Sequence, residues 1–146
     1  ELSEEAFKTD FVFSCLDNLG ARLHVNAQAY HQSTIIDGGT FGFNGKVQVT
    51  KKPSACFECA MTKRDYTLLW KKYSCVGEPL DFLDPKMPAV STTTSIIAAL
   101  QANELVKIVH EKPSLAGKYL HYDGIANSTR IFEVPKRKNC PVHEGE

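Results

Sequence analysis

Two short motifs rich in sulfur and nitrogen, far apart along the chain, have the clearest capacity for chemistry. Cys56 and Cys59 form a Cys-x-x-Cys motif, and Cys140 and His143 form a Cys-x-x-His motif near the end of the sequence. Thiolates and imidazole at this spacing are the ligands of closed tetrahedral zinc sites. A redox-active Cys-x-x-Cys or separately buried thiols are the alternatives, but a second motif is harder to explain by chance. The spacing therefore predicts a structural zinc site that folds the chain end against its middle.

Asp17 and Asn18 directly follow a short apolar run at residues 11–13, which is typical of a strand buried in a parallel sheet. In open α/β sheets ligands bind at the carboxyl ends of the strands. Asp17 is therefore a candidate ligand for Mg²⁺ beside a nucleotide, with Asn18 contributing its amide. Either residue also suits the N-cap of the helix that follows, and the spacing alone favours the cap.

Cys75 belongs to neither metal motif and lies at the start of a proline-containing segment, shortly after Lys71 and Lys72. Neighbouring cations favour the thiolate, so Cys75 is a candidate nucleophile. The alternative is a small buried apolar residue, which is the usual role of a lone cysteine and the one expected for Cys15.

The composition limits the classes of protein to which the chain can belong. Its 146 residues suit one core, with 42% hydrophobic and 23% charged residues. Seventeen Lys and Arg balance seventeen Asp and Glu, which argues against a general attraction to nucleic acid or to an anionic membrane. No apolar run approaches a membrane span, and the chain begins in charged residues rather than a secretory leader. Cysteines gathered in short motifs favour a reducing compartment, so we expect a cytoplasmic (or nuclear) protein.

The elements that must position these residues follow from hydrophobic periodicity. The second strand is expected to close at Asp37-Gly38-Gly39. Hydroxyl side chains at 91–94 are expected to cap the last helix, which is apolar nearly all round and should therefore be buried. The sequence predicts strands at 11–13, 34–36, 46–50, 119–122 and 129–134, helices at 19–30, 62–73 and 91–110, and a long loop at 74–88. This order predicts an α/β domain that a bound metal ion stabilises.

Five sequence motifs occur in a fixed order over nearly the whole chain. They are SCLDNLGAR at 14–22, IDGGTFGFNG at 36–45, ACFEC at 55–59, MPAVSTTTSIIAA at 87–99 and KNCP at 138–141. Together they resemble the ubiquitin-activating enzyme family, which extends to the adenylyltransferases of the ThiF and MoeB type that activate ubiquitin-like sulfur carriers. The resemblance implies a Rossmann-like adenylation domain with a structural zinc site.

The resemblance also implies roles for individual positions. Asp17 matches an aspartate that holds Mg²⁺ at ATP, and Asn18 matches an asparagine beside it that contacts the nucleotide. The three cysteines of the two metal motifs match structural zinc ligands. His143 stands where a fourth cysteine is usual, which keeps the geometry and removes one negative charge.

Cys75 matches the cysteine on the family's crossover loop, here residues 60–88, which accepts the activated C-terminus of a ubiquitin-like protein as a thioester. The residues that follow it, 76–79, are not the usual ones. The implied chemistry begins when a C-terminal glycine carboxylate attacks the α-phosphate of ATP. A thiolate then attacks the acyl-adenylate, giving a thioester that remains reactive enough to be passed on.

No Gly-x-Gly-x-x-Gly nucleotide loop occurs in this sequence. Residues 1–146 therefore resemble the C-terminal half of an adenylation domain, and an N-terminal half or partner subunit is expected to supply the loop. A conjugating enzyme and a dimeric assembly are further expected partners. Two alternatives stay open: a sulfur-carrier adenylyltransferase, in which Cys75 handles a persulfide or acyl disulfide, and a non-catalytic scaffold subunit that tolerates loss of Asp17 and Cys75.

Overall fold

The computed structural model describes residues 4–73 and 90–143. Its elements run from a short 3-10 helix to a closing strand pair. In chain order they are η1 (Glu4–Phe7), β1 (Phe11–Ser14), α1 (Leu19–Ala29), β2 (Thr34–Phe41), β3 (Asn44–Thr50), η2 (Phe57–Ala60), α2 (Lys63–Tyr73), α3 (Ser91–Val109), β4 (Lys118–Asp123) and β5 (Ser128–Glu133). Strands and helices mix in an α/β fold built on a five-stranded sheet, and the α/β class agrees with the sequence prediction.

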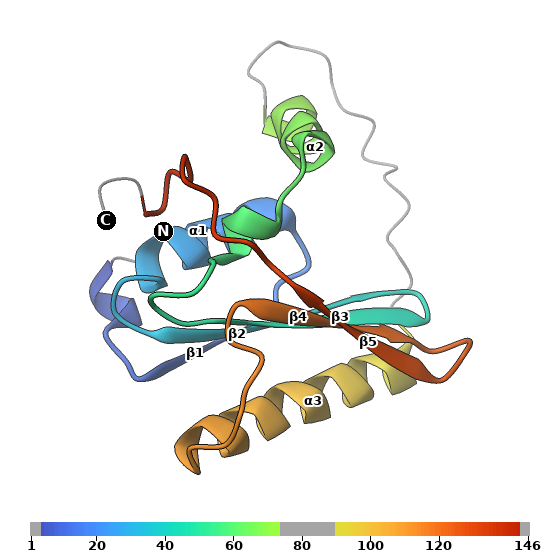
Figure 1. The fold of residues 1–146 in the computed structure, drawn as a ribbon. Coiled ribbons are helices and arrows are strands. Elements are labelled where there is room, and N and C mark those ends of the chain that lie inside the picture. Colours follow the sequence, from blue (N-terminus) through green and yellow to red (C-terminus); the bar gives the residue numbers. More distant parts are fainter. Residues whose placement is uncertain (1–3, 74–89, 144–146) are drawn as a thin grey trace.

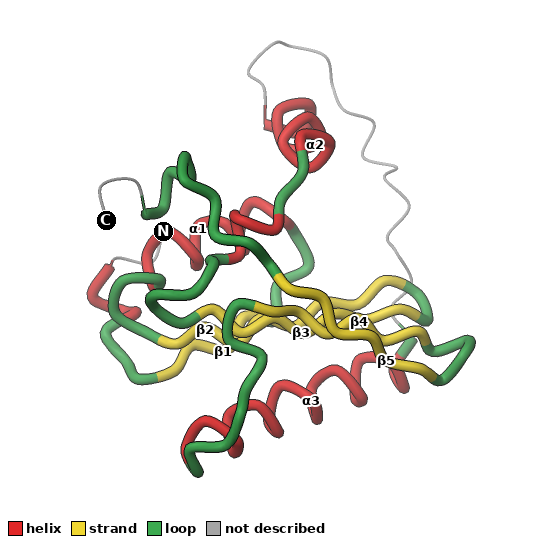
Figure 2. The backbone as a smooth tube through the Cα atoms, viewed as in Figure 1, coloured by secondary structure: helices red, strands yellow, loops and turns green. Residues whose placement is uncertain are grey.

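The strands follow the sheet in chain order, from β1 to β5. Among the neighbouring strands that the structure describes, β1 and β2 run parallel, and the other pairs are antiparallel. α1 supplies the crossover between the parallel strands, which antiparallel hairpins do not need. α3 lies along one face of the sheet, whereas α1 and η2 lie on the other and α2 stands farther out (Figure 1). The secondary-structure view shows the sheet as a layer between these helices (Figure 2).

Three apolar clusters among the described residues hold the layers together, and the smallest joins η1, α1 and β2 through Phe7, Ala29 and Ile35. Between the sheet and α3, the buried residues are Ile36, Val47, Val49, Ile97, Leu115 and Tyr122. On the opposite side, Tyr30 packs with Ala55, Val134 and the three cysteines of the metal motifs. The cluster around Tyr30 joins α1, the residues around η2 and the chain end, so the metal motifs lie within a core of their own.

The predicted end of the second strand is wrong. β2 continues through Asp37, Gly38 and Gly39 to Phe41, because these residues pair in register with β3 over its whole length. Gly38 has a packing reason to be glycine, since a Cβ there would overlap the side chain of Gln101 on α3. The glycine pair therefore marks a close approach of helix and strand rather than a turn.

The structure also corrects two predictions about α3. Its N-cap is Val90, with no side-chain cap, and the hydroxyls of Thr94 and Ser95 donate to carbonyls four residues back. The helix is buried on one side only, since Val106 and Val109 are 54% and 59% exposed. The hairpin predicted around Asp123-Gly124 and the helix predicted after Thr62 are both confirmed.

Candidate functional site

Cys56, Cys59, Cys140 and His143 converge, and all four are buried. Their ligand atoms all lie within 4.8 Å of one another. Cys56 Sγ lies 3.8 Å from Cys59 Sγ and 3.5 Å from Cys140 Sγ, and Cys59 Sγ lies 3.0 Å from His143 Nε2. A tetrahedral zinc ion with Zn–S bonds of about 2.3 Å would hold its sulfurs about 3.8 Å apart. Three sulfurs and one ring nitrogen at these separations therefore fit a zinc ion.

Short turns present the ligands in pairs. The backbone N–H of Cys59 donates to the carbonyl of Cys56, and the backbone N–H of His143 donates to the carbonyl of Cys140. A buried asparagine on α1, Asn26, accepts the backbone N–H of Phe57 at 3.0 Å. The first two bonds close the two turns, and the third fixes the Cys56–Cys59 turn to α1, which suits a structural metal site.

The pKa values of the two cysteines in the Cys-x-x-Cys motif shift in opposite directions. Burial raises the pKa of Cys56. Burial also acts on the Cys59 thiol, yet its pKa is lowered, because it accepts hydrogen bonds from the backbone N–H of Arg137 and from neighbouring thiols. A bound Zn²⁺ would supply the positive charge that keeps such thiols deprotonated.

A cleft of about 610 Å³ opens beyond the metal motifs. Its lining comes from the start of α1, the β2–β3 hairpin, η2 and β4. The residues are Asp17, Leu19, Arg22, Gly39, Thr40, Phe41, Asn44, Gly45, Lys46, Phe57 and His121. A carboxylate at the carboxyl end of a parallel strand thus faces a glycine-rich hairpin, which is where α/β sheets bind ligands.

Asn18 is the N-cap of α1, as the spacing favours, and its side-chain oxygen accepts the backbone N–H of Ala21 at 2.7 Å. Asp17 lies in the lining of the cleft instead. A carboxylate in this position suits a hard cation, whereas the oxygen of Asn18 is already engaged at the helix start. The magnesium role of Asp17 and the nucleotide contact of Asn18 stay predictions.

Arg22 connects the segment before α1 to strand β2 within the lining of the cleft. Its Nη1 lies 2.7 Å from Asp37 Oδ2, and its Nε and Nη2 donate to the carbonyls of Leu16 and Gly38. Asp37 also accepts the hydroxyl of Ser14 at 2.7 Å. Burial raises the pKa of Asp37, and the charge of Arg22 opposes that rise. The sequence reasoning missed Arg22, although its position one helical turn after Asn18 was a usable signal.

Lys46 is the second cation of the cleft. Its Nζ lies 4.7 Å from the centre of the Tyr119 ring and 5.3 Å from that of Phe57. Burial lowers its pKa, while the charge of Asp37 raises it. Neither Lys46 nor His121 was singled out from the sequence, because only the register of β3 and β4 brings them together.

The candidate nucleophile Cys75 lies outside the described residues, so its role stays a prediction. Cys15, expected to be buried, is exposed instead, because it follows β1 at the end of the strand. Among the described residues, no helix is long and apolar enough to cross a membrane.

Comparisons with known proteins show the family and the fold of this chain. The model of the ThiF family matches residues 1–142. The sulfur carrier protein ThiS adenylyltransferase of Escherichia coli K12 is 24% identical over 152 residues, covering 99% of this chain and 53% of that protein. SUMO-activating enzyme subunit 2 of Dictyostelium discoideum is 42% identical over 62 residues, covering 40% of this chain and 9% of that protein. The crystal structure of E. coli MccB superposes with a TM-score of 0.66 at 14% identity, covering 97% of this chain and 42% of that one.

Proposed function

Because this chain belongs to the ThiF family, we propose that it is the zinc-bearing C-terminal half of an adenylation domain. The chain spans about half the length of the ThiS adenylyltransferase that it matches. The proposed enzyme uses ATP to activate the C-terminal carboxylate of a ubiquitin-like protein. The observation that carries this proposal is the cleft in which Asp17 faces the glycine-rich β2–β3 hairpin.

The cleft offers distinct surfaces for the two substrates. Asp17 would hold a magnesium ion, which neutralises phosphate charge when bound. Thr40 and Asn44 line the cleft at the end of the hairpin, where an extended C-terminal segment could approach. Gly39 and Gly45 serve packing, since a Cβ there would overlap Arg22 and Ile97, respectively. The positive charge of Arg22 is already paired with Asp37, so Lys46 is the cation of the lining that remains for an anionic substrate.

A second step would transfer the acyl group to Cys75. The thiolate attacks the acyl carbon of the adenylate, a carbon–sulfur bond forms, and AMP leaves with the electrons of the broken carbon–oxygen bond. The resulting thioester suits transfer to a conjugating enzyme. Cys75 lies between α2 and α3 in the sequence, at the point that resembles the family's crossover loop, and that resemblance supports this assignment.

The zinc site has a structural role in this proposal. Its four ligands are all buried within 4.8 Å of one another, so no position is left open for a substrate. Zinc would fix the chain end against η2. The nucleotide loop would come from an N-terminal half or a partner subunit, in a dimeric assembly.

Pyrophosphate exchange into ATP tests the proposal. The chain is assayed with the polypeptide encoded directly upstream, where we place the nucleotide loop, and with the sulfur carrier protein ThiS or a SUMO protein as acceptor. Exchange is expected only when both parts are present. Asp17→Asn should abolish it, whereas Asp10→Asn, an exposed carboxylate outside the cleft, should not. Equal exchange by both variants would remove Asp17 from the chemistry.

Sulfur-carrier activation is the second candidate function. It is favoured by the match to a ThiS adenylyltransferase over 99% of this chain. The two functions differ in the final product on the acceptor protein. Mass spectrometry of the released acceptor in the presence of a sulfur donor separates them: an unchanged C-terminus indicates a thioester route, and replacement of one oxygen by sulfur indicates sulfur transfer.

A further inference from the structure

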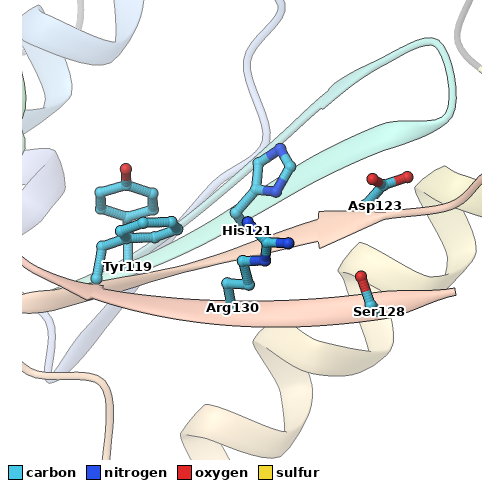
Figure 3. Close-up of a pocket in the computed structure, with 6 residues that line it drawn as sticks. Tyr119, His121, Asp123, Ser128 and Arg130 are labelled. Carbon is cyan, nitrogen blue, oxygen red and sulfur yellow. The ribbon is translucent and has the colours of Figure 1, made fainter. Parts of the chain in front are cut away.

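A row of basic side chains crosses the sheet on the face that α3 does not cover. Lys46 on β3 stands directly opposite His121 on β4, and His121 stands directly opposite Arg130 on β5. Alternate residues of β4, Leu120 and Tyr122, pack toward α3, so His121 belongs to the other face. Figure 3 shows His121 and Arg130 rising on the same side of the two strands.

The row borders a hollow of about 290 Å³. Its lining residues are Tyr119, His121, Asp123, Ser128, Arg130 and Phe132. The rings of Tyr119 and Phe132 stack with centres 5.0 Å apart and form one wall. His121 also lines the larger cleft that contains Asp17. The hollow and the cleft therefore adjoin, and one extended ligand could occupy both.

The charges in this hollow lack a matching partner within the described residues. Like charges directly opposite each other on neighbouring strands are unfavourable. No hydrogen bond or ion pair joins His121 or Arg130 to any residue that the structure describes. Asp123 is the carboxylate of the lining, but its Oδ1 accepts the backbone N–H groups of Ile125 and Ala126 in the hairpin turn.

The hydrogen bonds of the hairpin turn and the positive charges of the row both lower the pKa of Asp123. Its pKa is lowered, first by the turn hydrogen bonds from Ala126 and Ile125, and further by the charges of His121 and Arg130. A carboxylate brought into the hollow from outside would meet the same field and would find the donors of His121 and Arg130 unengaged by the described residues.

We propose that this row, Lys46, His121 and Arg130, binds an acidic side chain of the protein substrate on the segment that leads to its C-terminus. The inference rests on the proposed function, which puts that C-terminus near Asp17. Neighbouring strands lie about 4.8 Å apart, so the distance across the sheet from β1 to β4 or β5 is roughly 14–19 Å. At about 3.4 Å per extended residue, the acidic side chain stands roughly four to six residues before the C-terminus.

A protein partner suits the surroundings of the row better than a nucleic acid does. Exposed aromatic side chains flank it, with Phe41 56% and Phe132 42% exposed. Asp123 stands within the hollow and would repel a run of phosphates, whereas a single carboxylate can bind beside Arg130. The chain as a whole carries no net charge.

Fluorescence anisotropy with two labelled peptides tests the inference. Both are twelve residues long and end in Gly-Gly; one carries Glu at the fourth, fifth and sixth positions from its C-terminus, and the other carries Gln there. The 146-residue chain loaded with zinc is expected to bind the Glu peptide about 3- to 10-fold more tightly, as weak exposed pairs allow. Raising the salt concentration from 0.05 to 0.5 M should remove most of that preference.

Variants of one hairpin provide the matched comparison. Arg130→Gln and His121→Gln should each reduce the preference for Glu, and Arg130→Glu should reverse it toward a peptide with Lys at the same positions. Lys118→Gln removes a cation from β4 on the alternate set of residues, and it should leave the preference unchanged. Misfolding can remove a preference but cannot create one for the Lys peptide. The Arg130→Glu result therefore tests the inference even if another variant is unstable.

Three outcomes would overturn the inference. They are equal binding of the two peptides, a preference that survives Arg130→Gln, and a labelled ten-nucleotide single strand that competes more strongly than the Glu peptide does. Pyrophosphate exchange is measured separately in the reconstituted enzyme. If exchange occurs while the peptides bind equally, the inference alone fails; if exchange never occurs, the proposed function fails and the inference with it.

Discussion

Arg22 Nη1 and Asp37 Oδ2 lie 2.7 Å apart, and this ion pair joins α1 to the glycine-rich strand β2 behind the cleft. Both side chains are largely removed from solvent, with 14% and 3% exposed. The same guanidinium donates to the carbonyls of Leu16 and Gly38, so it holds the backbone just before Asp17. The position of Asp17, the candidate magnesium ligand, therefore depends on an ion pair between two residues farther along the chain.

Asp37→Asn should destabilise the fold by about 3 kcal/mol, because removing one member of a buried pair leaves the charge of Arg22 uncompensated. Urea denaturation of the zinc-loaded chain measures the change. Glu133→Gln is the control, since it breaks the exposed pair with Lys118, where the loss should stay below about 1 kcal/mol. Similar losses in both variants would mean that burial does not decide the strength of the Arg22–Asp37 pair.

Zinc should be present at close to one ion per chain, and its removal should unfold the domain. Binding of structural zinc contributes apparent free energies of about 10–16 kcal/mol at pH 7 in small domains, and apolar packing here surrounds the site. Elemental analysis gives the stoichiometry, and circular dichroism with a chelator gives the loss of structure. His143→Cys should retain zinc, because a fourth thiolate preserves the tetrahedral set.

Cys140→Ser should lose zinc, and Cys15→Ser should not, since Cys15 is exposed at the end of β1. A metal-free chain that is folded and equally stable would end the zinc interpretation.

Local spacing was enough to predict much of the site. The two metal motifs could be paired from the sequence because each supplies two ligands within one turn, and the structure brings all four together. A cap at Asp17 or Asn18 could be predicted because a capping interaction is local, and the structure shows that Asn18 is the cap, bonded three residues along the chain.

Long-range contacts could not be predicted in the same way. The burial of polar Gln101 and Glu104 on α3 depends on distant partners: Gln101 donates to the carbonyl of Ile36, and Glu104 accepts the N–H of Leu115. Periodicity alone predicts an apolar buried face instead. The row of Lys46, His121 and Arg130 likewise exists only through strand register.

Lys46 should make the free energy of unfolding increase with pH in the alkaline range below 10.5. Burial lowers its folded-state pKa below the usual 10.5, so the unfolded chain binds more protons between the lowered value and 10.5. The free energy of unfolding therefore increases with pH across that window. Lys46→Met removes this contribution, so the stability of the wild type minus that of the variant should grow as pH rises toward 10.5.

Urea denaturation at several pH values checks this slope. Lys118→Met, at a more exposed lysine on β4, is the matched control. A difference between wild type and Lys46→Met that stays constant with pH would show that folding does not shift the pKa of Lys46, and a difference that falls would show that folding raises it.

Cys75→Ala should separate the two steps of the proposed reaction. Cys75 is distinct from the metal motifs in the sequence, and adenylation needs magnesium and phosphate contacts rather than a thiol. In the reconstituted enzyme, the variant should keep pyrophosphate exchange nearly intact while losing the thiol-sensitive adduct with the acceptor protein. Denaturing electrophoresis with and without a reducing thiol detects the adduct.

Cys15 is the other cysteine outside the metal motifs, so Cys15→Ala is the control and should keep both activities. An adduct that survives Cys75→Ala but is lost in Cys15→Ala would assign the nucleophile to Cys15. Loss of exchange together with the adduct in Cys75→Ala would instead indicate that this cysteine supports the fold.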